Sequence, residues 1–140
     1  MTPRVLLDTN VVLDVLLARD PWLNDSRALW DAVDQGLLKA YLPASALTDI
    51  YYVARRLSTR ARAREAVQVC LDAFSLGAID RYVLERAQAL SGPDYEDDVL
   101  IACAELLGLD GIVTRDVADF ASAALSVWTP REFLDRLFES

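Results

Sequence analysis

Short apolar segments alternate along this chain with longer segments in which apolar residues recur every three to four positions. The short segments, typical of buried strands, are residues 5–7, 39–42, 77–79, 111–114 and 125–128. The longer segments, typical of amphipathic helices, are residues 10–18, 20–33, 45–57, 61–75, 80–90, 95–107 and 130–138. Because strands that alternate with helices favour an α/β fold, we expect a central, mostly parallel sheet of four to five strands with helices on both faces.

The length of the chain suits one domain. The 140 residues are 54% hydrophobic and include only five prolines and five glycines, so we expect a single ordered domain over residues 1–140. No apolar run approaches the ~18 residues of a membrane-spanning helix, and the stretch before Asp8 is too short for a secretory signal. Cys70 and Cys103 lie far apart, and we interpret both as reduced core residues. These features predict a cytoplasmic protein with no membrane contact.

The side chains available for chemistry are restricted. The sequence contains no histidine, which excludes histidine-based triads, imidazole metal ligands and histidine general bases. Two distant cysteines do not supply a zinc site, and no glycine-rich phosphate-binding loop is present. Carboxylates remain as the main candidates, and their oxygens prefer hard cations such as Mg²⁺ or Mn²⁺.

Four aspartates are placed where a site would form. Ligands of open α/β sheets bind at the carboxyl ends of the strands. Asp8 follows the first expected strand, Asp116 follows the fourth, and Asp49 lies in the first turns of the helix after the second strand. Asp97 joins them if its helix, which precedes the fourth strand, begins at the same edge. Carboxylates gathered in this way repel one another, and a bound cation or a shared proton relieves the repulsion.

Each of these residues also has a purely structural interpretation. Asp8 is suited to cap the helix that follows it, and Asp49 suits a first turn because of the helix dipole. The same dipole, together with solvation, explains the acidic run at residues 94–98. Asp116 can start a turn, and Asp119 fits an exposed helical position. Both kinds of interpretation remain open on the sequence alone.

The basic residues are unevenly distributed. The formal charge of −8 has the wrong sign for binding nucleic acid through overall charge. One short segment nevertheless contains five arginines: Arg55, Arg56, Arg60, Arg62 and Arg64. Because arginine forks match phosphate oxygens, this segment is a candidate RNA-binding strip, and a solvated face or a protein contact is the alternative.

Motifs in this order resemble those of the PIN-domain family. Residues 7–14 (LDTNVVLD) resemble the family's opening motif, and residues 45–53 (SALTDIYYV) its second motif. Residues 94–97 (DYED) are similar to the aromatic–acidic third motif, and residues 113–120 (VTRDVADF) to the fourth. Residues 128–134 match a recurrent ending, so that the resemblance covers almost the whole chain.

The resemblance implies a compact α/β/α sandwich and a Mg²⁺- or Mn²⁺-dependent endoribonuclease, most often the toxin of a bacterial toxin–antitoxin pair of the VapC kind. It implies an RNA substrate, a small antitoxin protein as partner, and a homodimer whose contact we place on residues 22–33 or 61–74. The residues that would bind the metal and act in catalysis are Asp8, Asp49, Asp97 and Asp116. The residues that would support them are Asn10, Thr114, Glu96, Asp98 and Asp119.

Two positions depart from the family pattern. Asp49 is one methylene shorter than the glutamate that is more usual there, which favours binding through water. Asp98 stands where the family has an uncharged residue, so it competes with Asp97 for the ligand role. We favour Asp97, because it matches the last acid of the third motif and leaves the apolar face of the helix intact.

Two other functions compete with the nuclease. A catalytically inactive PIN-like module would bind RNA or protein and keep the fold; the presence of all four acids argues against it, and failure to bind Mn²⁺ would favour it. A receiver-like signalling domain also gathers acids and Mg²⁺ at a sheet edge. It uses a lysine near the last strand, however, and the single lysine of this chain, Lys39, lies in the second strand.

Overall fold

A five-stranded parallel sheet forms the centre of the molecule. The computed structural model describes residues 2–139. The strands are β1 (Arg4–Leu7), β2 (Lys39–Pro43), β3 (Ser75–Gly77), β4 (Gly111–Val113) and β5 (Ser126–Trp128). They lie in the order β3-β2-β1-β4-β5, and every neighbouring pair is parallel. The predicted α/β class with a mostly parallel sheet is confirmed.

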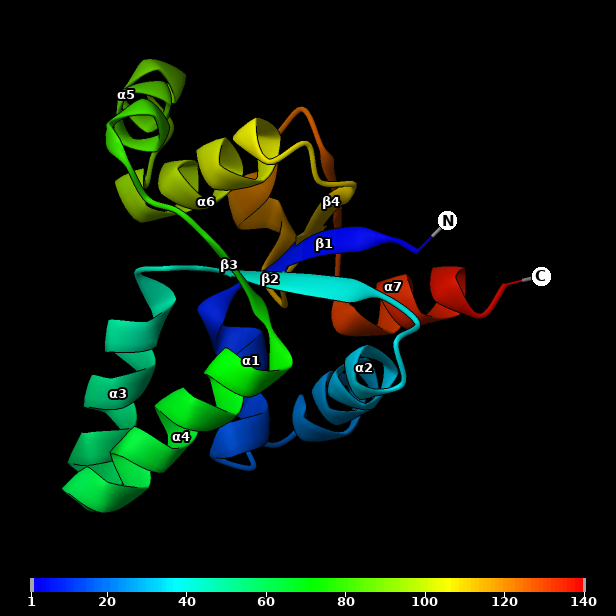
Figure 1. The fold of residues 1–140 in the computed structure, drawn as a ribbon. Helices are drawn as coiled ribbons and strands as arrows, with labels where there is room; N and C mark the ends of the chain where they lie inside the picture. Colours follow the sequence, from blue (N-terminus) through cyan, green and yellow to red (C-terminus); the bar gives the residue numbers. More distant parts are fainter. Residues whose placement is uncertain (1, 140) are drawn as a thin grey trace.

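Helices cover both faces of this sheet, as Figure 1 shows. They are α1 (Thr9–Leu16), α2 (Leu23–Asp34), α3 (Ala46–Leu57), α4 (Arg60–Ala73), α5 (Arg81–Leu90), α6 (Tyr95–Leu106) and α7 (Pro130–Leu137), with a short 3-10 helix η1 (Val117–Phe120). One apolar core lies between the sheet and α1, α2, α3, α4 and α7, and a second lies between the sheet and α5, α6 and η1. The chain is therefore an α/β/α sandwich.

Strand β1 shows why the opening segment is continuously apolar. Val5 and Leu7 pack into the first core, and Leu6 packs into the second. All three side chains are 2% exposed or less, because successive residues of a strand point to opposite faces and both faces are covered. Each buried aliphatic side chain contributes about 1.5–3 kcal/mol relative to an exposed one. The strand is thus fixed at the centre of the sheet, and Asp8 is placed at its carboxyl end.

Three expected boundaries were wrong. The third strand is β3, two residues earlier than the expected 77–79, so the preceding helix ends at Ala73 rather than at residue 75. The second helix does not begin with Pro21 in its first turn, because residues 20–22 form a turn and α2 starts at Leu23. The Asp20–Pro21 peptide bond is cis.

At one edge of the sheet, the loop that leaves β1 is hydrogen-bonded to β4, and the loop that leaves β4 is hydrogen-bonded to β5. The amide of Asp8 donates to the carbonyl of Val113 at 3.0 Å, and the amide of Thr114 donates to the carbonyl of Trp128 at 2.9 Å. These bonds extend the ladder beyond the strand ends and hold Asp8 and Thr114 side by side. Within residues 2–139, no helix has the length and apolar character needed to cross a membrane.

Candidate metal centre

A side-chain hydrogen bond joins Asp8 and Thr114 at this edge of the sheet. The hydroxyl of Thr114 donates to Oδ2 of Asp8 at 2.8 Å and accepts from the amide of Asp116 at 3.1 Å. Thr114 is completely buried. Asp8 occupies the cap position of α1, but its side chain makes no capping hydrogen bond. The hydroxyl of Thr114 thus links the carboxylate after β1 to the backbone after β4.

The carboxyl of Asp8 is partly buried without a cationic partner. Burial raises its pKa, and the charge of Asp116 raises it further. The hydrogen bond from Thr114 and the nearby backbone amides of Asn10 and Thr9 act against this rise. Because hydrogen-bond donors offset the cost of burying this negative charge only in part, a cation bound beside the carboxylate would stabilise it further.

Helix α6 begins at the same edge as the ends of β1 and β4 (Figure 1). Its first turn is capped by Asp94, whose carboxylate accepts from the amide of Asp97 at 3.2 Å. Asp97 lies close enough to the other acids that its pKa is raised to about 6, mainly by burial and then by the charges of Asp94, Asp8, Asp119 and Glu96. Asp97 was expected to join the other acids only if its helix began at their edge of the sheet, and α6 does begin there.

The neighbouring Asp98 has a different environment. It is only 3% exposed, and its Oδ2 accepts from the amide of Gly92 at 2.8 Å. The contact fixes the loop at residues 91–93 against the start of α6. The Asp98 side chain thus has a hydrogen-bond partner in this loop, whereas the charges of other carboxylates act on Asp97.

The remaining expected acids lie at the rim of the site. Asp49 is exposed in the first turn of α3, and Asp119 is exposed in η1. Glu96 lies in the first turn of α6, where burial raises its pKa and the charges of Asp49, Asp94 and Asp8 add to the rise. The acids of four chain segments are therefore within electrostatic reach of one another.

The donor set fits a hard divalent cation in its chemistry. Within residues 2–139, no ion pair involves Asp8, Asp97 or Asp116. Nor do any three potential metal-ligating side chains of that range lie close enough to hold a metal ion as they stand. The site is thus a concentration of unneutralised carboxylate oxygens, which are the ligands that Mg²⁺ and Mn²⁺ prefer.

Sequence reasoning missed a cluster beneath the acids. Asp14 on α1 is completely buried, with Arg115 Nη1 3.1 Å and Arg19 Nε 2.9 Å from its Oδ1. Arg19 also donates to Oδ1 of Asn10 at 3.3 Å, so Asn10 contacts a guanidinium group. The available signal was a lone carboxylate inside the apolar run of residues 11–16, since a buried charge needs a partner.

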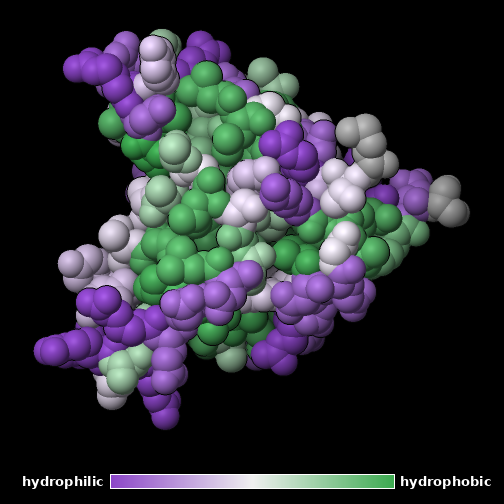
Figure 2. Space-filling view, in the orientation of Figure 1, coloured by the Kyte–Doolittle hydropathy of each residue, from purple (hydrophilic) through white to green (hydrophobic). Residues whose placement is uncertain are grey.

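The arginine strip lies away from the acids, at the tip of the α3–α4 hairpin. Arg55 and Arg56 end α3, and Arg60, Arg62 and Arg64 begin α4; all five are exposed. None of them forms an ion pair within residues 2–139. Figure 2 shows a strongly hydrophilic lower left corner at this hairpin. The strip is therefore free to meet a partner.

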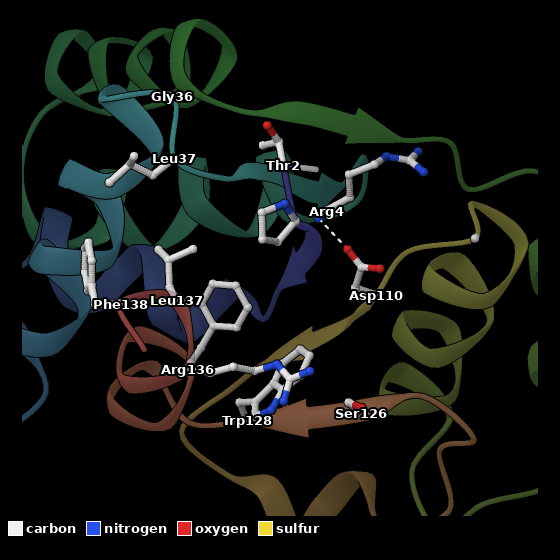
Figure 3. A pocket seen from close by; sticks show the side chains of 13 residues that line it. Thr2, Arg4, Gly36, Leu37, Asp110, Ser126, Trp128, Arg136, Leu137 and Phe138 are labelled. Carbon is white, nitrogen blue, oxygen red and sulfur yellow. Dashed lines mark hydrogen bonds between the residues drawn. The ribbon is translucent and has the colours of Figure 1, made fainter. Parts of the chain in front are cut away.

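A groove lies at the opposite end of the sheet from the acids. It encloses about 960 Å³ and is lined by residues at the start of β1, on β5 and on α7 (Figure 3). Arg4 and Asp110 lie at its rim, where the Arg4 amide donates to the Asp110 carboxylate at 2.8 Å. No acid of the candidate site lines this groove, so its shape does not bear on the metal centre.

The parallel sheet, the helices on both faces and the acidic edge define an α/β domain with a carboxylate-rich centre. A model of the PIN domain matches residues 4–118. The chain therefore belongs to the PIN domain family, as its motifs indicated.

Solved structures of similar fold include proteins of toxin–antitoxin systems. A toxin–antitoxin complex from Klebsiella pneumoniae is 23% identical and has a TM-score of 0.68, covering 90% of this chain and 97% of that one. A DNA-bound VapBC from Salmonella typhimurium is 15% identical with a TM-score of 0.69, covering 93% and 99%. VapC20 from Mycobacterium tuberculosis, described as a toxin that cleaves the sarcin–ricin loop, is 14% identical with a TM-score of 0.68, covering 87% and 96%. No curated protein matches the chain.

Proposed function

We propose that this chain is a Mg²⁺- or Mn²⁺-dependent endoribonuclease and the toxin of a toxin–antitoxin pair that acts in the cytoplasm. Membership of the PIN family and the toxin–antitoxin proteins of similar fold support the proposal. The observation that carries it is the convergence of acids from four segments, with the pKa of Asp97 raised to about 6. Such mutual repulsion is what a bound cation relieves.

In this proposal each site residue has a separate role. Asp8 and Asp97 hold the cation, while Asp49 and Asp116 complete the cluster or orient the attacking water. When bound, the cation supplies Lewis-acid stabilisation of the phosphate and favours deprotonation of a water. Because the chain has no histidine, carboxylates must accept the proton. Thr114 keeps the Asp8 carboxylate aimed through its 2.8 Å hydrogen bond.

The supporting residues act around this core. Asn10 is held by Arg19 beside Asp8, and Asp98 fixes the loop that precedes the helix of Asp97. Glu96 and Asp119 add negative charge at the rim, as their effect on neighbouring pKa values indicates. These residues tune the affinity for the cation.

The partners follow from charge and exposure. The arginine strip would bind the phosphates of RNA, or an acidic segment of a small antitoxin that blocks the same path. A homodimer would form through apolar residues exposed on α4, where Val69 is 46% and Leu71 is 45% exposed. Sedimentation of the purified chain measures that dimer directly.

Metal binding is tested by thermal unfolding. Mn²⁺ should raise the melting temperature of the wild type, since a ligand at 100 times its Kd adds about 2.7 kcal/mol to the stability of the folded state. The rise should be much smaller for Asp8→Asn. Asp31→Asn, which changes an exposed acid of α2, is the matched control and should respond like the wild type. An equal rise in the wild type and Asp8→Asn would remove Asp8 from the site.

Catalysis is tested on single-stranded RNA with and without the cation. We expect Mn²⁺-dependent cleavage by the wild type and none by Asp8→Asn. RNA binding without cleavage, in a wild type that binds Mn²⁺, would favour the inactive PIN-like module instead.

A further inference from the structure

Two arginines, Arg19 and Arg115, adjoin residues of the acidic edge. Arg115 sits in the chain between Thr114, which binds Asp8, and Asp116. Arg19 reaches Asn10, two residues after Asp8, through a 3.3 Å hydrogen bond from its Nη2. Both cations are therefore next to residues that we assign to the metal centre.

Neither guanidinium pairs with an acid of the site. Both turn to Asp14, whose side chain is 0% exposed. Arg115 Nη1 donates to Oδ1 at 3.1 Å and to Oδ2 at 3.4 Å. Arg19 Nε lies 2.9 Å from Oδ1 as an ion pair without a hydrogen bond along its N–H. The buried carboxylate of Asp14 thus forms ion pairs with both arginines.

A third contact limits the movement of Arg115. Its guanidinium carbon lies 3.7 Å from the centroid of the Trp22 ring, a cation–π contact that covers one face of the group. The side chain is 17% exposed. Asp14 and Trp22 together hold this cation in one orientation, with its edge turned to Asp14.

The consequence concerns competition for the acids. A divalent cation and a guanidinium compete for the same carboxylate oxygens, because both are stabilised by negative charge and arginine forks pair with carboxylates readily. Asp8 acts electrostatically on Asp14, which places the two carboxylates near each other. An arginine released from Asp14 would therefore have the acids of the site as its nearest alternative partners.

On the basis of the proposed metal-dependent function, we propose that Asp14 is a positioning residue: it binds Arg115 and Arg19 and so keeps Asp8 and Asp116 free for a divalent cation. Asp14 itself does not contact the cation. Its cluster carries a net charge of one positive unit, which also limits the repulsion among the acids above it.

The test is the affinity for Mn²⁺, measured by titration calorimetry on the metal-free protein. Asp14→Asn should weaken Mn²⁺ binding by about tenfold, because two guanidinium groups are released toward the acids. The triple variant Asp14→Asn/Arg19→Gln/Arg115→Gln should recover wild-type affinity or exceed it, because no cation is left to compete. Asp25→Asn removes a carboxylate that pairs with Arg131 on the surface and is the charge-matched control.

A purely structural role for Asp14 predicts the opposite order. The triple variant, which loses three buried or half-buried charges, would then bind Mn²⁺ as weakly as Asp14→Asn or more weakly. That result would overturn the proposal. If Asp14→Asn does not fold by circular dichroism, the single variant Arg115→Gln decides: equal or tighter Mn²⁺ binding supports the proposal, and weaker binding overturns it. A wild type that does not bind Mn²⁺ would contradict the proposed function instead.

Discussion

Adjacent carboxylates at the start of α6 contact different partners. Asp98 is buried and accepts from the amide of Gly92 at 2.8 Å, whereas Asp97 faces Asp8, Asp94 and other acids. A one-residue step along a helix turns the side chain by about 100°, since the helix has 3.6 residues per turn. The two side chains therefore have different surroundings, although both residues are acidic and neighbours in sequence.

Substitution of each by asparagine separates these roles. Asp97→Asn should abolish cleavage of single-stranded RNA, because it removes a charged ligand. Asp98→Asn should keep most of the cleavage, because its amide oxygen still accepts from Gly92. Asp98→Ala should lower the free energy of unfolding by about 1–3 kcal/mol, since it leaves a buried N–H without its partner. Cleavage lost in Asp98→Asn and kept in Asp97→Asn would reverse the assignment.

The raised pKa of Asp97 predicts a pH dependence of the metal-free protein. The folded pKa of about 6 exceeds the ordinary value of 3.8, so the folded state binds more protons between these values. Stability contributed by this group therefore falls as pH rises from about 4 to about 6. Thermal unfolding in chelator should show the fall, and Asp97→Asn should flatten it and melt higher at neutral pH. Identical pH profiles for the two proteins would contradict the raised pKa.

The sequence predicted the placement of Asp8 and Asp116 because both follow strands whose position is fixed by continuous apolar runs. It left Asp97 conditional, because the direction of α6 depends on how α5 and α6 pack together and not on local pattern. It missed the pairing of Asp14 with Arg115 because the two residues are 101 positions apart, and only the fold brings α1 and the end of β4 together.

At the scale of elements, the loop at residues 91–93 sets the start of α6. Ser91 adopts a left-handed conformation with φ 50° and ends α5. Gly92 then passes so close to Asp98 that an added Cβ would lie 2.4 Å from its Oδ1. The glycine is needed for this approach of the backbone to a buried carboxylate. The expected helices left residues 91–94 outside any element, but the sequence pattern did not indicate that a glycine is needed there.

Gly92→Ala should therefore weaken the start of α6. The methyl group must displace either the loop or Asp98, and overpacking of this kind costs about 1–3 kcal/mol. We expect a lower melting temperature and weaker Mn²⁺ binding, since the same turn carries Asp97. Ser91→Gly is the control and should melt near the wild type, because glycine adopts the left-handed conformation freely. Unchanged melting in Gly92→Ala would show that the loop adjusts without affecting the site.

Element boundaries were less predictable than element types. The turn at residues 20–22 contains an Asp–Pro pair that suits a helix start, yet α2 begins only at Leu23. Strand β3 has three residues, too few for its apolar pattern to fix its ends. In contrast, the expected start of the last helix at residue 130 agrees with α7, whose first turn is held by the capping box of Thr129 and Glu132.

Across the whole molecule, acidic and basic side chains are concentrated in different places. The net charge is −8, and the acids of the site lie at the edge of the sheet, whereas the arginine strip projects on the α3–α4 hairpin (Figure 2). From Asp49 to Arg56 the helix rises about 10 Å, at 1.5 Å per residue, which is about two nucleotides of a single strand. An RNA strand that crosses the acids therefore reaches the strip within a short length.

The salt dependence of RNA binding tests this path. Replacing Arg60, Arg62 and Arg64 with glutamine should weaken binding of single-stranded RNA and lower the slope of log K against log salt by about 2, since each phosphate contact contributes about 0.7. Mn²⁺ binding should stay unchanged. The control replaces Arg27, Arg81 and Arg136, exposed on other helices, which changes the net charge equally. An equal loss in both triple variants would mean that overall charge, and not the strip, binds the RNA.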